Sequence, residues 1–188
     1  MLKIGYLGPE GTYSSYAARL YDKENLKIPF NTINEVLNSL KSSDASQVIV
    51  PLENSINGSI VEVLDYLASK NNFQIIAELN IEINHSIYSL GKINPANVEV
   101  VYSHPQALAQ CYDYLVNNFK NAKHKASNST ADSYNDLINS NEKGVFIGPP
   151  WMKEQDGIIV MGENIPVSYT HLRAHETKAN LVCRLLLE

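Results

Sequence analysis

Short apolar runs alternate with segments of helical spacing along most of the chain. Mostly apolar runs at residues 2–7, 47–52 and 98–102 predict buried strands, because a strand covered on both faces needs no polar alternation. Further strands are expected at residues 27–30, 73–79, 81–90, 145–147 and 158–161. Helices are expected where apolar residues recur every three or four positions, at residues 14–21, 32–40, 60–67, 104–115 and 129–138.

This alternation of strands and helices predicts an α/β fold with mostly parallel sheets. Two strands lie close together at residues 73–90, and there the chain is expected to cross into a second lobe. The run at residues 158–165 is the expected place of return. The first lobe is therefore predicted to comprise residues 1–78 plus about 159–166, and the second lobe residues 79–158.

The composition narrows the class of protein. The chain has 188 residues, a formal net charge of −5 at pH 7 and no basic run, which disfavours nucleic acid or an anionic membrane as the main partner. No apolar stretch approaches the roughly 20 residues needed to cross a bilayer. The apolar start of the chain is too short for a signal peptide. Two cysteines do not form a disulfide framework, which favours a reducing cytoplasm.

The last part of the chain differs in character from the rest. Residues 167–177 and 181–188 resemble, in that order, two stretches of a translated sequencing-library adapter, and two of the three arginines lie here. We therefore exclude residues 167–188 from the fold prediction as a non-native tail, and expect the natural gene to continue differently. The alternative is a natural C-terminal helix over residues 181–188.

Four polar turns follow predicted strands and lead into predicted helices, which is where ligands bind in open α/β sheets. They are residues 8–12 (GPEGT), 53–59 (ENSINGS), 103–106 (SHPQ) and 128–132 (NSTAD). Helix N-termini and hydroxyls can hold an anion, and a histidine can act as a general acid or base. Each turn also has an ordinary structural explanation: a glycine turn, a helix cap at Ser59, Ser129 or Thr130, or a structural His104.

The common metal and nucleotide motifs are missing from the sequence. His85, His104 and His124 lack the spacing of metal ligands, and there is no Walker loop, dinucleotide fingerprint or CxxC pair. Cys111 lies in an apolar helix and is expected in the core, not as a nucleophile.

Taken together, the four turns resemble those of the prephenate dehydratase family, over residues 5–165. The similarity rests on GPEGTYS at residues 8–14, VPLENS and NGS within residues 50–59, YSHPQALAQC at residues 102–111, and STA at residues 129–131. It implies a two-lobed fold like that of type II periplasmic binding proteins, with the site in the cleft between the lobes. It also implies that prephenate is converted to phenylpyruvate, water and carbon dioxide in phenylalanine biosynthesis, without a cofactor.

The resemblance implies a role for each turn. Glu53, Asn54 and Gln106 are expected to be catalytic, with Asn54 donating a hydrogen bond to prephenate, and His104 is expected to brace its turn. A homodimer or larger oligomer is implied as well. The residues expected to bind substrate are Gly11, Thr12, Ser55, Asn57, Gly58, Ser59, Ser103, His104, Ser129, Thr130 and Ala131.

The sequence departs from the family pattern in one place. A late Asn…Thr-Arg-Phe motif, whose threonine is the key catalytic group of the family, should follow residues 163–165, but the adapter-like segment begins there instead. The chain as written is therefore expected to be impaired, and it carries no sign of an ACT regulatory domain. Two alternatives stay open: a non-catalytic bilobal module that binds small anions, and an arogenate or mixed cyclohexadienyl dehydratase.

Overall fold

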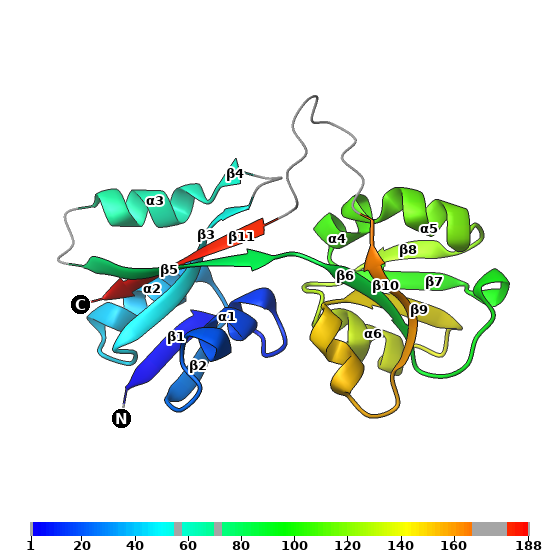
Figure 1. Ribbon diagram of the computed structural model, residues 1–188, viewed down its shortest axis with the longest axis horizontal. Helices are drawn as coiled ribbons and strands as arrows, with labels where there is room; N and C mark the ends of the chain where they lie inside the picture. The colour runs from blue at the N-terminus through cyan, green and yellow to red at the C-terminus, as the bar shows by residue number, and fades with distance from the viewer. Residues whose placement is uncertain (1, 55–57, 70–72, 167–179, 188) are drawn as a thin grey trace. The chain divides into compact units, whose positions relative to one another are not determined.

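The computed structural model describes residues 2–54, 58–69, 73–166 and, by their backbone, 180–187. The chain divides into two compact units, Met1–Ile83 with Thr177–Glu188, and Asn84–Glu176. Each unit consists of one sheet with helices on both faces (Figure 1). Among the described residues, no helix is both long enough and apolar enough to cross a membrane.

The first unit has a six-stranded sheet in the order β2-β1-β3-β11-β5, with the short β4 paired to β3. The neighbours of β1 are parallel to it, whereas β11 is antiparallel to both β3 and β5. Its elements are β1 (Lys3–Leu7), α1 (Tyr13–Tyr21), β2 (Leu26–Phe30), α2 (Ile33–Lys41), β3 (Gln47–Asn54), β4 (Gly58–Ser59), α3 (Val61–Ala68), β5 (Gln74–Glu82) and β11 (Asn180–Leu187).

Two apolar layers hold the first unit together. Alternate residues of β3 point to opposite faces of the sheet: Val48 and Val50 pack under α2 and α3, while Ile49 packs under α1. Because both faces are covered, β3 reads as a continuous apolar run, which is why the sequence predicts it correctly.

The second unit has a five-stranded sheet in the order β10-β6-β9-β7-β8. Strands β8, β7 and β9 are parallel, whereas β6 is antiparallel to both β9 and β10. Its elements are β6 (His85–Ser89), η1 (Pro95–Asn97), β7 (Val100–Ser103), α4 (Pro105–Gln110), α5 (Tyr112–Asn118), β8 (Lys123–Ala126), α6 (Asp132–Asn139), β9 (Gly144–Gly148), η2 (Pro150–Glu154) and β10 (Ile159–Ile165).

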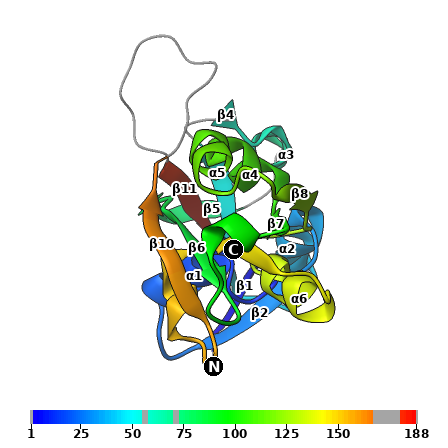
Figure 2. The same cartoon turned by 90° about the vertical axis from the view of Figure 1, so that its right-hand side faces the viewer.

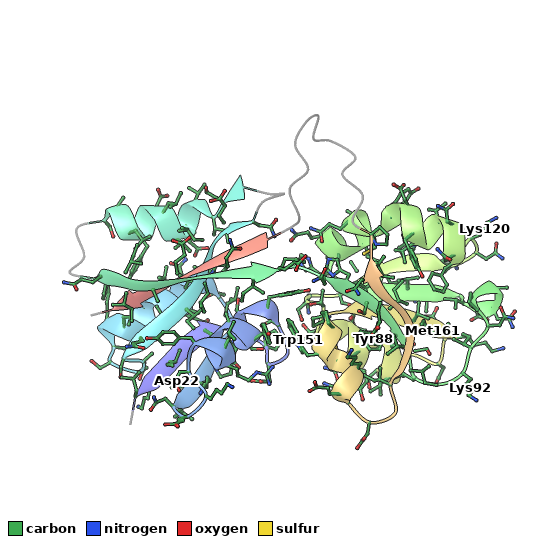
Figure 3. The ribbon with its side chains drawn as sticks, in the orientation of Figure 1. Asp22, Tyr88, Lys92, Lys120, Trp151 and Met161 are labelled. Atoms are coloured by element: carbon green, nitrogen blue, oxygen red, sulfur yellow. The ribbon has the colours of Figure 1, made fainter. Side chains whose placement is uncertain are left out.

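The helices of the second unit cover its sheet from two sides, α4 and α5 on one face and α6 on the other (Figures 1 and 2). Under α4 and α5 the core contains Val101, Ile147 and Cys111, all fully buried. Under α6 it contains Tyr88 and Phe146, with Trp151 packed against them (Figure 3). Cys111 therefore lies in the core, as predicted, and burial raises the pKa of its thiol to about 12.

The structure confirms a two-unit α/β fold, with three differences from the sequence prediction. Both sheets are mixed, because β11 in the first and β6 in the second run against their neighbours. Strand β10 pairs with β6 and so belongs to the second unit, which corrects the expected return of residues 159–166 to the first lobe. The boundary between the two units in the chain lies between Ile83 and Asn84, whereas the predicted boundary lay between residues 78 and 79.

The adapter-like tail contains a strand, not the helix considered as an alternative. Residues 180–187 form β11 and pair with both β3 and β5. Residues 167–179, including the stretch around Thr170, lie outside the described residues. The backbone of the tail thus takes part in the first sheet, although the sequence analysis excluded the tail from the fold.

Candidate functional site

Most of the predicted site residues of the second unit lie at one edge of its sheet, where the parallel strands β7, β8 and β9 end. Strands β7 and β8 are parallel in register, with Ser103 opposite Ala126, so the turns that follow them leave the sheet side by side. Strand β6 runs the opposite way and places its first residue, His85, at the same edge, next to the end of β9. The carboxyl ends of parallel strands are the usual ligand edge of an α/β sheet.

Ser103 lies at this edge, but its hydroxyl is used inside the protein. The residue is fully buried, and its Oγ donates to the backbone carbonyl of Ile147 at 3.0 Å. The same carbonyl accepts a second hydrogen bond from Ser133 Oγ at 3.1 Å. Ser103 therefore ties β7 to β9, and its predicted contact with substrate is not tested by these bonds.

His104 braces the start of α4, as expected. It occupies the N-cap position, and its Nδ1 accepts from the backbone N–H of Gln106 at 3.3 Å. Partial burial lowers the pKa of the imidazole, so the ring is neutral at neutral pH and able to accept this bond. Gln106 follows one residue after Pro105, and its side-chain Nε2 is buried without a hydrogen-bond partner among the described residues.

The fourth turn leads into α6. Ser129 Oγ accepts from the backbone N–H of Asp132 at 3.0 Å and donates to the Asp132 carboxylate at 2.9 Å. The Thr130 carbonyl accepts from Ser133 Oγ, and Ala131 directly precedes the helix. Ala131 holds the N-cap position without a side-chain cap bond, so the cap expected at Ser129 or Thr130 is wrong, and the Ser129 hydroxyl instead bonds to Asp132, the first helical residue. The turn also places a carboxylate, that of Asp132, at the helix end where a substrate carboxylate was expected.

The first predicted turn, in the first unit, is likewise closed by its own hydrogen bonds. Thr12 caps α1 by accepting from Ser15 N–H at 3.3 Å and donates to the carbonyl of Pro9 at 2.9 Å. The Gly11 N–H donates to Ser15 Oγ at 2.9 Å, and Gly11 has a φ of 88°, which only glycine adopts without strain.

The second predicted turn forms a small hairpin at the end of β3. Glu53 pairs with Ser59 and Asn54 with Gly58. The helix cap expected at Ser59 is wrong: Ser59 lies in β4, and Ile60 holds the N-cap position of α3. The Glu53 side chain is exposed at the carboxyl end of β3, as the site prediction requires. Ser55 and Asn57 lie outside the described residues.

Sequence reasoning missed three polar residues at the edge of the second unit. Among the described residues, five buried side-chain atoms lack a hydrogen-bond partner, and four of them belong to this edge: His85 Nδ1, Gln106 Nε2, Gln110 Nε2 and Ser127 Oγ. A buried polar atom without a partner costs about 1–3 kcal/mol, so four at one edge point to a site that receives a polar ligand. Gln110 lies four residues after Gln106 on α4, and this spacing was the one available signal.

Two of these residues form a buried pair. His85 Nε2 lies 2.6 Å from Gln110 Oε1, and the residues are only 3% and 5% exposed. An amide oxygen can only accept, so His85 Nε2 carries the proton and donates. Burial lowers the pKa of His85, with the Gln110 hydrogen bond acting in the opposite direction, so the ring is neutral at neutral pH.

The four predicted turns contain no lysine or arginine. The turns themselves offer an anion hydroxyls, amides and backbone N–H groups, and the nearby Arg19 of α1 lies 3.3 Å from Glu10 of the first turn. Among the described residues, no group of three or more histidine, cysteine, aspartate or glutamate side chains is placed to hold a metal ion.

Comparison with known sequences gives one consistent family. The family model described as prephenate dehydratase matches residues 4–170. The bifunctional chorismate mutase/prephenate dehydratase of Buchnera aphidicola subsp. Schizaphis graminum (strain Sg) is 37% identical over 145 residues, which are 75% of this chain and 37% of that protein. The chain spans between about a third and a half of the length of the first curated relatives that it matches.

Two of the solved structures with a similar fold are prephenate dehydratases. The prephenate dehydratase of Arthrobacter aurescens, in complex with L-Phe, has a TM-score of 0.84 and 24% identity, covering 99% of this chain and 60% of that one. The prephenate dehydratase of Staphylococcus aureus subsp. aureus Mu50 has a TM-score of 0.77 and 26% identity, covering 100% of this chain and 66% of that one.

Proposed function

The chain belongs to the prephenate dehydratase family, and from this premise we propose that it carries the substrate site of a dehydratase acting on prephenate. The reaction is a carbon–oxygen lyase step that gives phenylpyruvate, water and carbon dioxide. These products contain every atom of prephenate, so the reaction needs no external oxidant or reductant. The protein then serves phenylalanine biosynthesis. Its cytoplasmic location and its assembly as a homodimer or larger oligomer stay predictions.

The observation that carries this proposal is the set of buried polar atoms without partners at the edge of the second sheet. Gln106 Nε2 and Gln110 Nε2 are hydrogen-bond donors aligned along α4, directly after the Ser103–His104 turn. Prephenate offers oxygen acceptors in two carboxylates, a keto group and a hydroxyl. Amide donors in a water-poor site bind such oxygens more strongly than they would in water.

Chemistry at this site needs a proton for the departing hydroxyl. His85 and His104 both have lowered pKa values and are neutral at neutral pH, so neither is a ready acid there. We assign the proton donor to the hydroxyl of the Thr-Arg-Phe motif that the family resemblance implies. Loss of carbon dioxide then completes an aromatic ring, so positioning and one donor supply the catalysis. Glu53 and Asn54, which belong to the first unit, are proposed to be catalytic as well.

We also propose that residues 167–188 are foreign to the natural protein. On this proposal the natural continuation supplies both β11 and the threonine, whereas the adapter-like tail supplies only a backbone that can pair. The chain as written then binds prephenate but turns it over poorly.

The test is turnover of prephenate to phenylpyruvate, followed by ultraviolet absorbance. The 188-residue chain is compared with a chain in which the natural continuation replaces residues 167–188. We expect activity in the completed chain and at least about 100-fold less in the chain as written, the usual effect of a lost proton donor. Activity in neither, with prephenate still bound, would favour a non-catalytic binding module. A preference for arogenate in the same assay would favour an arogenate dehydratase. Equal activity in both chains would refute the foreign tail.

A further inference from the structure

The hydrogen bond between His85 and Gln110 fixes which end of the Gln110 amide is available to a ligand. Gln110 is the last residue of α4 and His85 the first of β6, so the bond joins the helix to the sheet at the site edge. Because His85 Nε2 donates to Gln110 Oε1, the oxygen end of the amide is occupied. The nitrogen end, buried and without a partner among the described residues, keeps both N–H donors unused.

A glutamine amide on its own can present either end to a ligand. In this structure the oxygen end faces His85 Nε2 at 2.6 Å, so the neutral ring bonds it by donating from that atom. With His85 replaced by an acceptor, the amide would turn over and offer its oxygen instead. The geometry therefore assigns His85 to setting the polarity of Gln110.

Resting on the proposed function, we propose that His85 is a positioning residue which holds Gln110 as a donor for an oxygen acceptor of the substrate. The acceptor is a carboxylate, keto or hydroxyl oxygen, and a group that can only donate, such as an ammonium, is disfavoured at this position. The bare Nδ1 of His85, also buried and without a partner among the described residues, is a further acceptor of the pair.

No charged group on the elements named here accounts for the orientation of the Gln110 amide. Gln106, one helical turn before Gln110, is uncharged, and Cys111 beside it stays protonated because burial raises the pKa of its thiol to about 12. Opposite His85 in the sheet lies Ile165 of β10. The pair therefore acts through hydrogen-bond direction and not through charge.

The test is a double-mutant cycle on the 188-residue chain, with the dissociation constant of prephenate measured by isothermal titration calorimetry. We expect His85→Leu and Gln110→Leu each to weaken binding about 5- to 20-fold, since each removes or misdirects one hydrogen bond to the ligand. The double variant should bind as Gln110→Leu does, because His85 acts only through Gln110. His85→Gln offers an N–H donor as well as an acceptor oxygen, so it should recover only part of the binding that His85→Leu loses.

A matched control is His124→Leu, which removes a histidine of the same unit that contacts the Tyr112 ring and should leave binding unchanged. Three results would each overturn the proposal. The first is a double variant whose loss of prephenate affinity is the product of the two single losses. The others are unaltered binding in His85→Leu and no recovery of binding in His85→Gln. Unaltered binding together with a lowered melting temperature would reduce His85 to a structural role. If the wild-type chain itself binds no prephenate, the proposed function fails first, and that result is seen before any variant is made.

Discussion

At the scale of single residues, the serines at the edge of the second sheet differ in how their hydroxyls are used. Ser103 and Ser133 both donate to the Ile147 carbonyl, at 3.0 and 3.1 Å. Ser127 follows β8 directly, donates its backbone N–H to the Ser103 carbonyl, and is 6% exposed, but its Oγ has no partner among the described residues. Removing an oxygen that is bonded and one that is not should therefore have different effects.

Alanine at these two serines gives opposite expectations for stability. Ser103→Ala removes a buried hydrogen bond and should lower the free energy of unfolding by about 1 kcal/mol. Ser127→Ala removes an unpaired buried hydroxyl and should leave that free energy unchanged or raise it. Urea unfolding of both variants measures the difference. Equal losses would mean that Ser127 has an internal partner and is no candidate for binding.

The pH dependence of stability follows from His85. Its pKa is lowered in the folded protein by burial, so between the folded pKa and the ordinary value near 6.5 the unfolded chain binds the additional proton. Stability from this group is fully present above about pH 6.5 and falls as the pH drops toward the folded pKa. His104 and His124, whose pKa values burial also lowers, act in the same direction.

Replacement of His85 by glutamine should flatten this dependence. The variant cannot take up a proton in either state, so its melting temperature should fall less between pH 7.5 and 5.5 than that of the wild type. Differential scanning fluorimetry at both pH values makes the comparison, and His124→Gln should flatten the dependence less than His85→Gln, because the His124 side chain is exposed whereas His85 is buried. An identical drop in wild type and His85→Gln would show that His85 does not contribute.

At the scale of elements, Gly144 lets α6 lie close to the sheet. A Cβ on Gly144 would lie 2.6 Å from both Leu137 Cδ1 of α6 and Val100 Cγ1 of β7, so these buried side chains would have to shift. Gly144→Ala should cost about 1–3 kcal/mol of unfolding free energy, the usual effect of overpacking. Gly91→Ala is the matched control, because nothing lies within 4 Å of its added Cβ. Equal stability of the two variants would contradict this tight packing.

The elements also show what the sequence could predict. Strands and helices with a clear apolar pattern were found where expected, because burial creates that pattern. Strand β8 was missed because its sequence, KHKA, has no apolar pattern and is exposed throughout. Lysines are common on edge strands, where they disfavour pairing with another chain. The predicted helix over residues 104–115 is two helices that meet at Cys111. The unit to which β10 belongs depends on its pairing partner, which no local pattern contains.

The site shows the same division. Its turns could be recognised because family motifs and helix starts are local in the sequence. The sequence could not show which hydroxyls are already hydrogen-bonded inside the protein, since Ser103 and its acceptor Ile147 are 44 positions apart in the chain. The His85–Gln110 pair spans 25 positions, so neither residue stood out alone.

At the scale of the whole chain, the first sheet depends on β11. In the described part of the sheet, β5 is paired only through β11, and β11 is in turn paired with β3. The second unit has its own sheet and its own two apolar layers. Loss of β11 would therefore affect the two units unequally.

Removal of residues 167–188 should separate β5 from the first sheet and leave the second sheet paired. Hydrogen–deuterium exchange would report this as lost protection of the amides of β5 and retained protection in β7 and β9, whose strands lie inside the other sheet. The contrast between strands of one sample is its own control against global unfolding. Retained protection in β5 would mean that its pairing with β11 does not form in solution. Loss in both units would mean that the second unit cannot hold its core alone. The predicted pattern, with β5 exposed and β7 protected, would show that pairing with β11 is what holds β5 in the first sheet.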